Sequence, residues 1–159
     1  MNEPAEFAYH RGMAPIMWVF FALATIELFA VHLLVATRWP AVGWPLSILS
    51  GCAVLWIALL IRSLPRRPHR IEGKKLVLNL GSLHDVTLDL ADIAAIQSAW
   101  EAGGDKAADA LKLSAIAYPN RCLVLAKPLP RGKARVFIWL DDPAAFDAAL
   151  AARGVPLNA

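Results

Sequence analysis

The sequence has only two cysteines, Cys52 and Cys122, and they lie far apart in the chain. They form no metal-binding or redox spacing, and they do not support the disulfide framework of a small secreted domain. A phosphate-binding glycine loop, a zinc-protease helix motif and a nucleophile elbow are also missing from the sequence. We therefore expect no metal, no cofactor and no enzymatic activity.

Charge is nearly absent from two long stretches of the chain. Residues 15–36 contain a single formal charge, Glu27, and residues 41–61 contain none. With 58% hydrophobic and 18% charged residues, the chain is too apolar for an average soluble domain. A hydrocarbon core of about 30 Å requires a helix of about 20 apolar residues. The pattern predicts a transmembrane helical hairpin over residues 15–62.

A cleaved secretory signal is the alternative interpretation of the first apolar stretch. It fits poorly because the leader carries Glu3 and Glu6, the apolar run is too long, and a second run follows almost at once. Basic residues are sparse before and between the spans, at Arg11 and Arg38. They are abundant after the second span, at Arg62, Arg66, Arg67, Arg70, Lys74 and Lys75. The positive-inside rule then predicts a multi-pass inner (plasma) membrane protein with both termini in the cytoplasm.

The connection between the two spans contains Pro40, Gly43 and Pro45. Because proline suits the first turn of a helix, we expect the first helix to end before Pro40 and the second to begin near Pro45. Trp39 and Trp44 fit the outer membrane interface.

Residues 63–69 contain two prolines and several basic residues, and we interpret them as a basic juxtamembrane linker. Residues 70–159 then hold 11 Lys and Arg against 10 Asp and Glu. A nearly neutral domain without a basic stripe disfavours nucleic-acid binding. We expect residues 70–159 to form a cytoplasmic β-rich domain and residues 1–14 to be a separate cytoplasmic segment.

Alternating apolar residues predict several strands in this domain. The first two flank a turn at Glu72–Gly73, and the second of them places Leu76, Leu78 and Leu80 on one face. Further strands are indicated at residues 84–90, 112–118, 121–126 and 134–140. Residues 91–100 fit either a helical turn or a strand, and residues 101–110 fit a loop ending in a short helix.

The end of the chain has the features of an amphipathic helix. Asp142 can cap its start, Pro143 suits the first helical position, and Gly154 can stop it. Phe146 and Leu150 lie four residues apart and share one face. We expect this helix to close a small sheet.

The order of these elements resembles that of bacterial two-span membrane proteins with a small pleckstrin-homology-like (PH-like) cytoplasmic domain. The resemblance rests on "RIEGKKLVL", "TLDLADIAAI" and the terminal "DDPAAFDAAL", and it covers roughly residues 70–153. It implies a membrane α-helical hairpin plus an α+β domain, in which a bent antiparallel PH-like sheet is capped by a C-terminal helix. It implies an architecture more readily than an activity.

Glu27 and His32 are unusual inside an apolar span, where an ionised side chain costs about 2.5 to 3.5 kcal/mol. Five residues of α-helix separate their directions by about 140°, so they are not a ligand pair on one helix. Antiparallel packing of the spans would place Glu27 opposite Trp56, and His32 opposite Gly51, which is flanked by Ser50 and Cys52. We interpret these residues as polar helix contacts, with proton handling and haem ligation by His32 as alternatives.

Two basic groups are candidate lipid or partner surfaces. The residues after the second span can attract anionic headgroups or only determine topology. A second group, Lys127, Arg131, Lys133 and Arg135, lies on or near a turn and can face the membrane, a partner or solvent. His69, His84, Asp85 and Glu101 have no spacing that demands an active site, and we interpret a histidine in a turn as polar surface. A deep pocket lined with His84, Asp85 or Glu101 near the bilayer surface would instead favour a third class, an enzyme that acts on lipid.

These observations predict a membrane-anchored binding, scaffold or accessory subunit that presents a PH-like domain at the cytoplasmic membrane face. Its expected partners are membrane lipids and either a protein or further copies of the chain in the membrane. The alternative is a small oligomeric transporter or proton-coupled component that uses Glu27 and His32. Two spans do not easily enclose a path, so this alternative requires oligomerisation or a larger complex.

Overall fold

The computed structural model describes residues 5–114 and 116–158, and the chain divides into two compact units. One unit is the hairpin Ala14–Ser63, and the other is made from the residues on both sides of it. The boundaries therefore differ from the expected ones. The residues before the hairpin are not a separate segment, because they fold with the domain that follows it.

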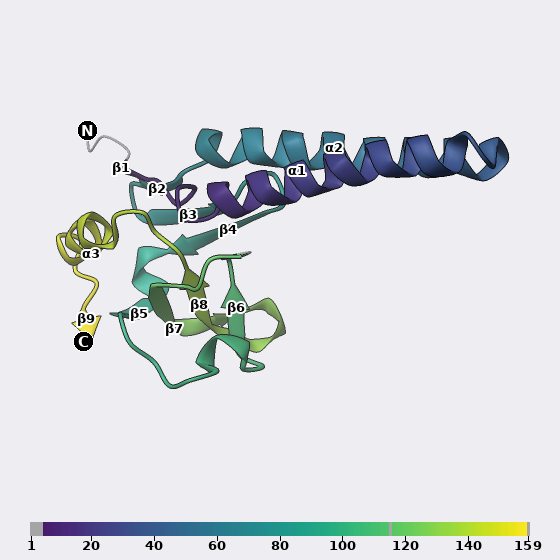
Figure 1. The fold of residues 1–159 in the computed structure, drawn as a ribbon. Coiled ribbons are helices and arrows are strands. Elements are labelled where there is room, and N and C mark those ends of the chain that lie inside the picture. Colours follow the sequence, from purple (N-terminus) through teal and green to yellow (C-terminus); the bar gives the residue numbers. More distant parts are fainter. Residues whose placement is uncertain (1–4, 115, 159) are drawn as a thin grey trace. The chain divides into compact units, whose positions relative to one another are not determined.

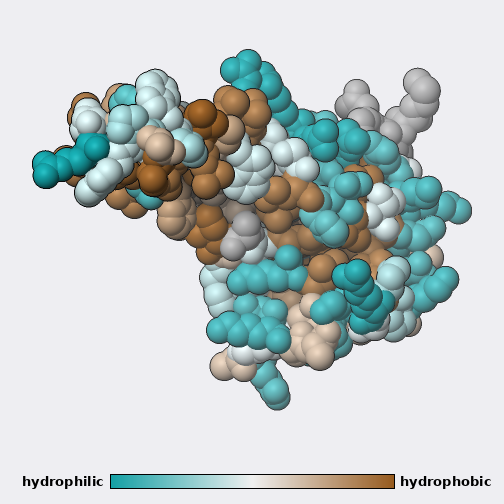
Figure 2. All heavy atoms as spheres, turned by 90° about the vertical axis from the view of Figure 1, so that its right-hand side faces the viewer, coloured by the Kyte–Doolittle hydropathy of each residue, from teal (hydrophilic) through white to brown (hydrophobic). Residues whose placement is uncertain are grey.

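The hairpin consists of two apolar helices joined by a short connection (Figure 1). Helix α1 covers Ala14–Val31 and continues as a π-helical turn over His32–Ala36, and helix α2 covers Pro40–Ser63. Both are long and apolar enough to cross a membrane. Few of their residues are buried, unlike those of a core helix in a soluble protein, and Figure 2 shows hydrophobic side chains exposed on the hairpin.

Helix α2 begins at Pro40, so the expected start near Pro45 is wrong. The Trp39 carbonyl accepts hydrogen bonds from the backbone N–H groups of Val42 and Gly43, which sets the first turn. Proline suits the first helical position because its missing N–H would have no helical partner there. Pro45 lies inside α2, where its ring removes one helical hydrogen bond.

The first sheet of the domain contains four antiparallel strands in the order β1-β2-β3-β4. They cover Ala5–Phe7, His69–Glu72, Lys75–Leu80 and His84–Asp89. Strand β1 precedes the hairpin and β2 follows it, yet Ala5 pairs with Ile71 and Phe7 with His69. The hairpin is thus inserted between two neighbouring strands. A strand of three residues is too short to produce a recognisable sequence pattern, which explains why β1 was missed.

The second sheet has the strand order β6-β8-β7-β5-β9. Its strands cover, in chain order, Ile93–Gln97, Ala110–Lys112, Arg121–Leu129, Lys133–Ile138 and Leu157–Asn158. Strands β6 and β8 are parallel, as are β5 and β9, so the sheet is mixed rather than purely antiparallel. The ambiguous stretch 91–100 provides β5. In the described part of the predicted strand 112–118, only Lys112 lies in a strand, and residue 115 lies outside the described residues.

Helix α3 covers Pro143–Ala151 and confirms the helix predicted at the end of the chain. The Asp142 carboxylate accepts a hydrogen bond from the backbone N–H of Ala145 at 3.0 Å, which caps the first turn. Phe146 and Leu150 are fully buried. Gly154 has φ +86°, a left-handed conformation that favours glycine and ends the helical region.

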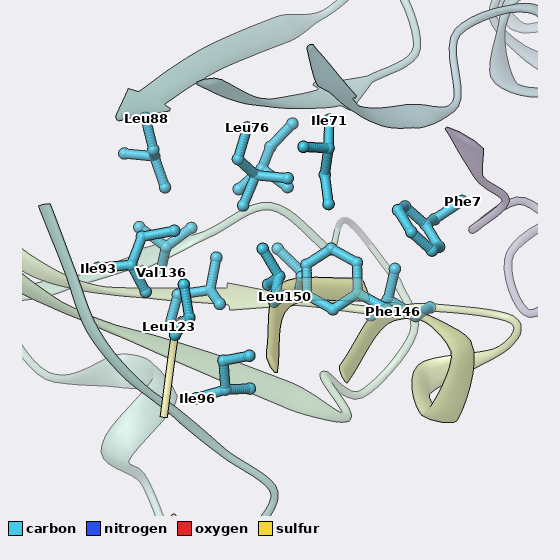
Figure 3. Packing of buried hydrophobic residues seen from close by; sticks show 14 of the residues in the cluster. Phe7, Ile71, Leu76, Leu88, Ile93, Ile96, Leu123, Val136, Phe146 and Leu150 are labelled. Atoms are coloured by element: carbon cyan, nitrogen blue, oxygen red, sulfur yellow. The ribbon is translucent and has the colours of Figure 1, made fainter. Parts of the chain in front are cut away.

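The core of the domain lies between the two sheets, with α3 at one end (Figure 1, Figure 3). Apolar side chains of both sheets point toward one another, and Phe146 and Leu150 of α3 complete the cluster. Phe7 of β1 packs edge-to-face on Phe146, with ring centroids 5.1 Å apart. Strand β1, which precedes the hairpin, and helix α3, near the end of the chain, therefore contribute to the same hydrophobic core. The domain is a mixed α/β sheet structure.

Candidate binding surfaces

His32 forms a contact between the two helices of the hairpin. Its Nδ1 lies 3.1 Å from the Ser47 hydroxyl, and its ring meets the ring of Trp44 edge-on with centroids 5.2 Å apart. The expected neighbours of His32 were Ser50 and Gly51, so its actual partner lies one helical turn nearer the connection. A Cβ built on Gly43 would collide with the Ala36 backbone, which indicates that the helices meet closely at this end.

Glu27 is not paired with Trp56 in the hairpin. Both side chains are exposed, and no hydrogen bond joins them in the described part of the chain. In antiparallel helices, moving five residues back from His32 to Glu27 corresponds to moving five residues forward from Ser47 to Cys52. Cys52, rather than Trp56, therefore lies level with Glu27. The expected polar contact of Glu27 is therefore absent from the isolated hairpin as described, and the carboxyl faces outward.

The basic residues after the second span separate into different surfaces. Arg62 lies in the last turn of α2. Lys74 lines a pocket beside the β2–β3 turn, and Lys75 pairs with Asp89 across β3 and β4. A different depression contains three of the predicted residues together, namely Arg66, Arg67 and Arg70. Of the basic residues that follow the second span in sequence, only Arg66, Arg67 and Arg70 line the same depression.

The second basic group is largely bound into the fold. The Arg135 guanidinium donates two hydrogen bonds to the Asp109 carboxylate, at 2.7 and 2.8 Å, and lowers the pKa of that carboxyl. The Lys133 ammonium donates to the Ala108 carbonyl at 2.8 Å. Lys127 and Arg131 stay exposed, and Arg131 has φ +65° at the tip of the β7–β8 turn. Only part of this group is thus available to a partner.

The sequence did not predict a buried polar cluster around His69. The interpretation of His69 as polar surface is wrong. The His69 side chain is fully buried, and its Nδ1 accepts a hydrogen bond from the backbone N–H of Asn79 at 3.0 Å. The ring stacks on Tyr9, with centroids 4.4 Å apart, and the Tyr9 hydroxyl accepts from the Gly81 N–H at 2.6 Å. The cluster joins the segment before the hairpin to β2 and β3.

The environment of His69 fixes its protonation. An Nδ1 that accepts a hydrogen bond leaves the proton of the neutral ring on Nε2. Burial lowers the pKa of His69 to about 4, although the Trp139 carbonyl and the Asp141 carboxylate act in the opposite direction. Alternation along β2 gives the signal that was overlooked, because His69 and Ile71 share one face and Ile71 is buried. The neutral ring is a structural element.

The other polar residues considered for chemistry do not meet in one site. His84 and Asp85 are exposed on β4, and Glu101 lines a pocket with Trp100 and Arg135 on the second sheet. Within residues 5–114 and 116–158, no three His, Cys, Asp or Glu side chains are close enough to hold a metal ion.

These features define a class of protein in which an apolar two-helix hairpin is inserted between adjacent strands of a two-sheet domain. No family model, curated protein or solved structure matches the chain.

Proposed function

We propose that this protein is an inner-membrane-anchored binding or scaffold subunit, and not an enzyme, whose domain lies at the cytoplasmic membrane face. The observation that supports this proposal best is the pairing of β1 with β2 across the hairpin insertion. Two neighbouring strands must lie on the same side of a membrane. The helices between them then cross it twice, and the excess of basic residues after α2 favours the cytoplasmic side.

The domain offers surfaces suited to a protein partner. Strand β4 forms one edge of the first sheet, and four of its six residues are exposed. An exposed edge can bind an extended segment of another chain through backbone hydrogen bonds. A PH-like relationship would fit the two sheets and the capping helix, and it remains part of the proposal.

Exchange of the hairpin tests the proposal. Residues 14–63 would be replaced by an unrelated two-span hairpin, and complexes of the full chain would be isolated from native membranes in mild detergent. We expect the same stoichiometric partner with either hairpin, because the domain carries the binding surface. The reciprocal chimera, with the native hairpin in an unrelated domain, should lose that partner. A partner that follows the hairpin instead would contradict the proposal.

A second candidate function, proton-coupled transport by an oligomer, is favoured by one observation. Glu27 is exposed on an apolar helix, where intramembrane ionisable groups are often functional. The Glu27→Gln variant keeps the shape of the side chain and removes the charge. Transport predicts normal assembly with lost proton flux in reconstituted vesicles, whereas the scaffold function predicts an unchanged partner complex and no flux from either protein.

A further inference from the structure

The face of the first sheet that points away from the core presents a row of side chains. Arg70 of β2 pairs with Val77 of β3, and Val77 pairs with Thr87 of β4. Since directly paired residues point to the same face, these three side chains form one row across the sheet. All three lie on the face opposite the core residues Ile71, Leu76 and Leu88.

This row is the floor of a polar depression of about 610 Å³. The residues that line it are Arg66, Arg67, Arg70, Glu72, Val77, Asn79, Asp85 and Thr87. Three guanidinium groups and two carboxylates thus line the same depression. Arg70 is held by Glu72, with 2.8 Å between Nε and Oε1, whereas Arg66 and Arg67 form no ion pair in the described part of the chain.

The chain limits how far Arg66 can lie from the end of α2. Arg66 is three residues beyond Ser63, where α2 ends. Three residues span at most about 10 Å even when fully extended. If α2 crosses a membrane, Arg66 therefore lies within the headgroup layer or directly next to it.

We propose that the depression binds the phosphate group of an anionic phospholipid, with Arg66 and Arg67 as the main donors and Thr87 as a hydroxyl donor on the floor. The inference rests on the proposed membrane anchoring and adds a ligand to it. Guanidinium groups match the geometry of phosphate oxygens and donate charge-assisted hydrogen bonds to them. The Arg70–Glu72 ion pair holds the third guanidinium in place, and the three arginines outnumber the two carboxylates, Glu72 and Asp85, in the lining.

The alternative explanation of these arginines is that they only determine the topology of the hairpin. Thr87 separates the two explanations, because it carries no charge and belongs to a strand far from the span in sequence. A topology signal does not depend on Thr87, whereas a binding site on this face of the sheet does.

The test uses the full chain in mild detergent and measures binding of short-chain phosphatidylglycerol by native mass spectrometry. The site variant is Arg66→Gln with Arg67→Gln, and the uncharged variant is Thr87→Val. The control, Lys106→Gln, removes a charge from an exposed position that belongs to neither of the two candidate basic groups. Unchanged thermal unfolding checks that every variant is folded.

We expect phosphatidylglycerol affinity to fall about 25-fold in the double arginine variant, since each surface charge contributes about fivefold. Thr87→Val should weaken binding about threefold, and the control should change it less than twofold. Equal losses in the control and the site variant, or wild-type affinity in Thr87→Val, would overturn the inference.

Two further arms identify the source of the phosphate. Phosphatidylcholine, which carries a phosphate but no net charge, should bind more weakly than phosphatidylglycerol, and inorganic phosphate should compete only at far higher concentration. Inorganic phosphate that binds as tightly as the lipid would overturn the assignment to a lipid. Lipid binding that fails while the partner complex of the hairpin chimera persists would refute this inference and leave the proposed function standing.

Discussion

The hairpin and the domain use apolar residues in opposite ways. Along the hairpin, large apolar side chains such as Phe29, Leu34 and Leu49 are more than 60% exposed, whereas Phe146, Leu123 and Val136 of the domain are fully buried. Exposed apolar surface is stable only in contact with lipid or a partner, and buried apolar surface stabilises a fold by itself. The difference indicates that the surroundings stabilise the hairpin, while its own core stabilises the domain.

The domain is also held together by stronger side-chain polar contacts than the hairpin. In the domain, the Arg121 guanidinium donates to the Asp147 carboxylate at 2.6 to 2.9 Å and thereby joins β7 to α3. In the hairpin, His32–Ser47 is the only side-chain hydrogen bond between the helices, as far as residues 14–63 are described. The hairpin should therefore tolerate side-chain changes that the domain does not.

The largest effect is expected from truncating the same residue type in the two units. Phe146→Ala should destabilise the domain by about 3 to 5 kcal/mol, because it removes a fully buried ring. Phe29→Ala should leave the unfolding of the domain unchanged, because that ring is 63% exposed on the hairpin. Denaturant unfolding of the full chain in detergent measures both. Equal destabilisation by the two variants would contradict the comparison.

Acidification should destabilise the domain through His69. Its pKa is about 4 in the folded state against 6.5 in an unperturbed state, so the unfolded chain binds a proton that the folded domain rejects. Stability is therefore complete above about pH 6.5 and falls by about 3 kcal/mol as the pH drops toward 4. Unfolding measured between pH 4 and 7 tests this loss.

A matched variant isolates the contribution of His69 to that pH dependence. His69→Gln should flatten the slope between pH 4 and 6.5, although the variant will be less stable near neutral pH. His84→Asn should keep the wild-type slope, because His84 is exposed on β4. An unchanged slope in the His69 variant would show that other groups cause the pH dependence.

Within the hairpin, the largest effect should come from the close approach near the connection. Gly43→Ala should destabilise the helix pair by about 1 to 3 kcal/mol, because its Cβ would collide with Ala36. Gly51→Ala should be neutral or stabilising by up to about 1 kcal/mol, since the added Cβ meets nothing within 4 Å and alanine favours a helix. Unfolding of the full chain in mixed micelles compares the two, and the reverse order would disprove the helix register.

The smallest effect is expected at the His32–Ser47 contact. Ser47→Ala removes one hydrogen bond between the helices and should destabilise the hairpin by about 0.6 kcal/mol. Ser50→Ala is the control, because Ser50 was the expected neighbour of His32 and lies elsewhere in the structure. The same mixed-micelle measurement applies, and a larger effect at Ser50 would restore the expected register.

Features with a local cause were predicted well from the sequence. The cap at Asp142, the buried pair Phe146 and Leu150, and the turn at Gly73 with φ +59° depend on residues a few positions apart. The two apolar helices follow from composition alone. Periodicity and turn chemistry are sufficient at this range.

Features that join distant residues were missed. Strand β1 is recognisable only through its pairing with β2, more than 60 residues away along the chain. The three arginines of the depression were predicted as part of a longer basic run, and only the sheet register adds Thr87 to them. His69 looks like surface in the sequence and is buried because Tyr9 covers it.

The sequence by itself determined the two apolar helices and the strands and helix with strong periodicity. The tertiary structure decided that the hairpin interrupts a sheet, which turn of α2 meets His32, and which basic residues share a surface. The physical reason is range. Hydrophobic pattern and turn chemistry act over a few residues, whereas strand pairing and helix register depend on side chains that only folding brings together.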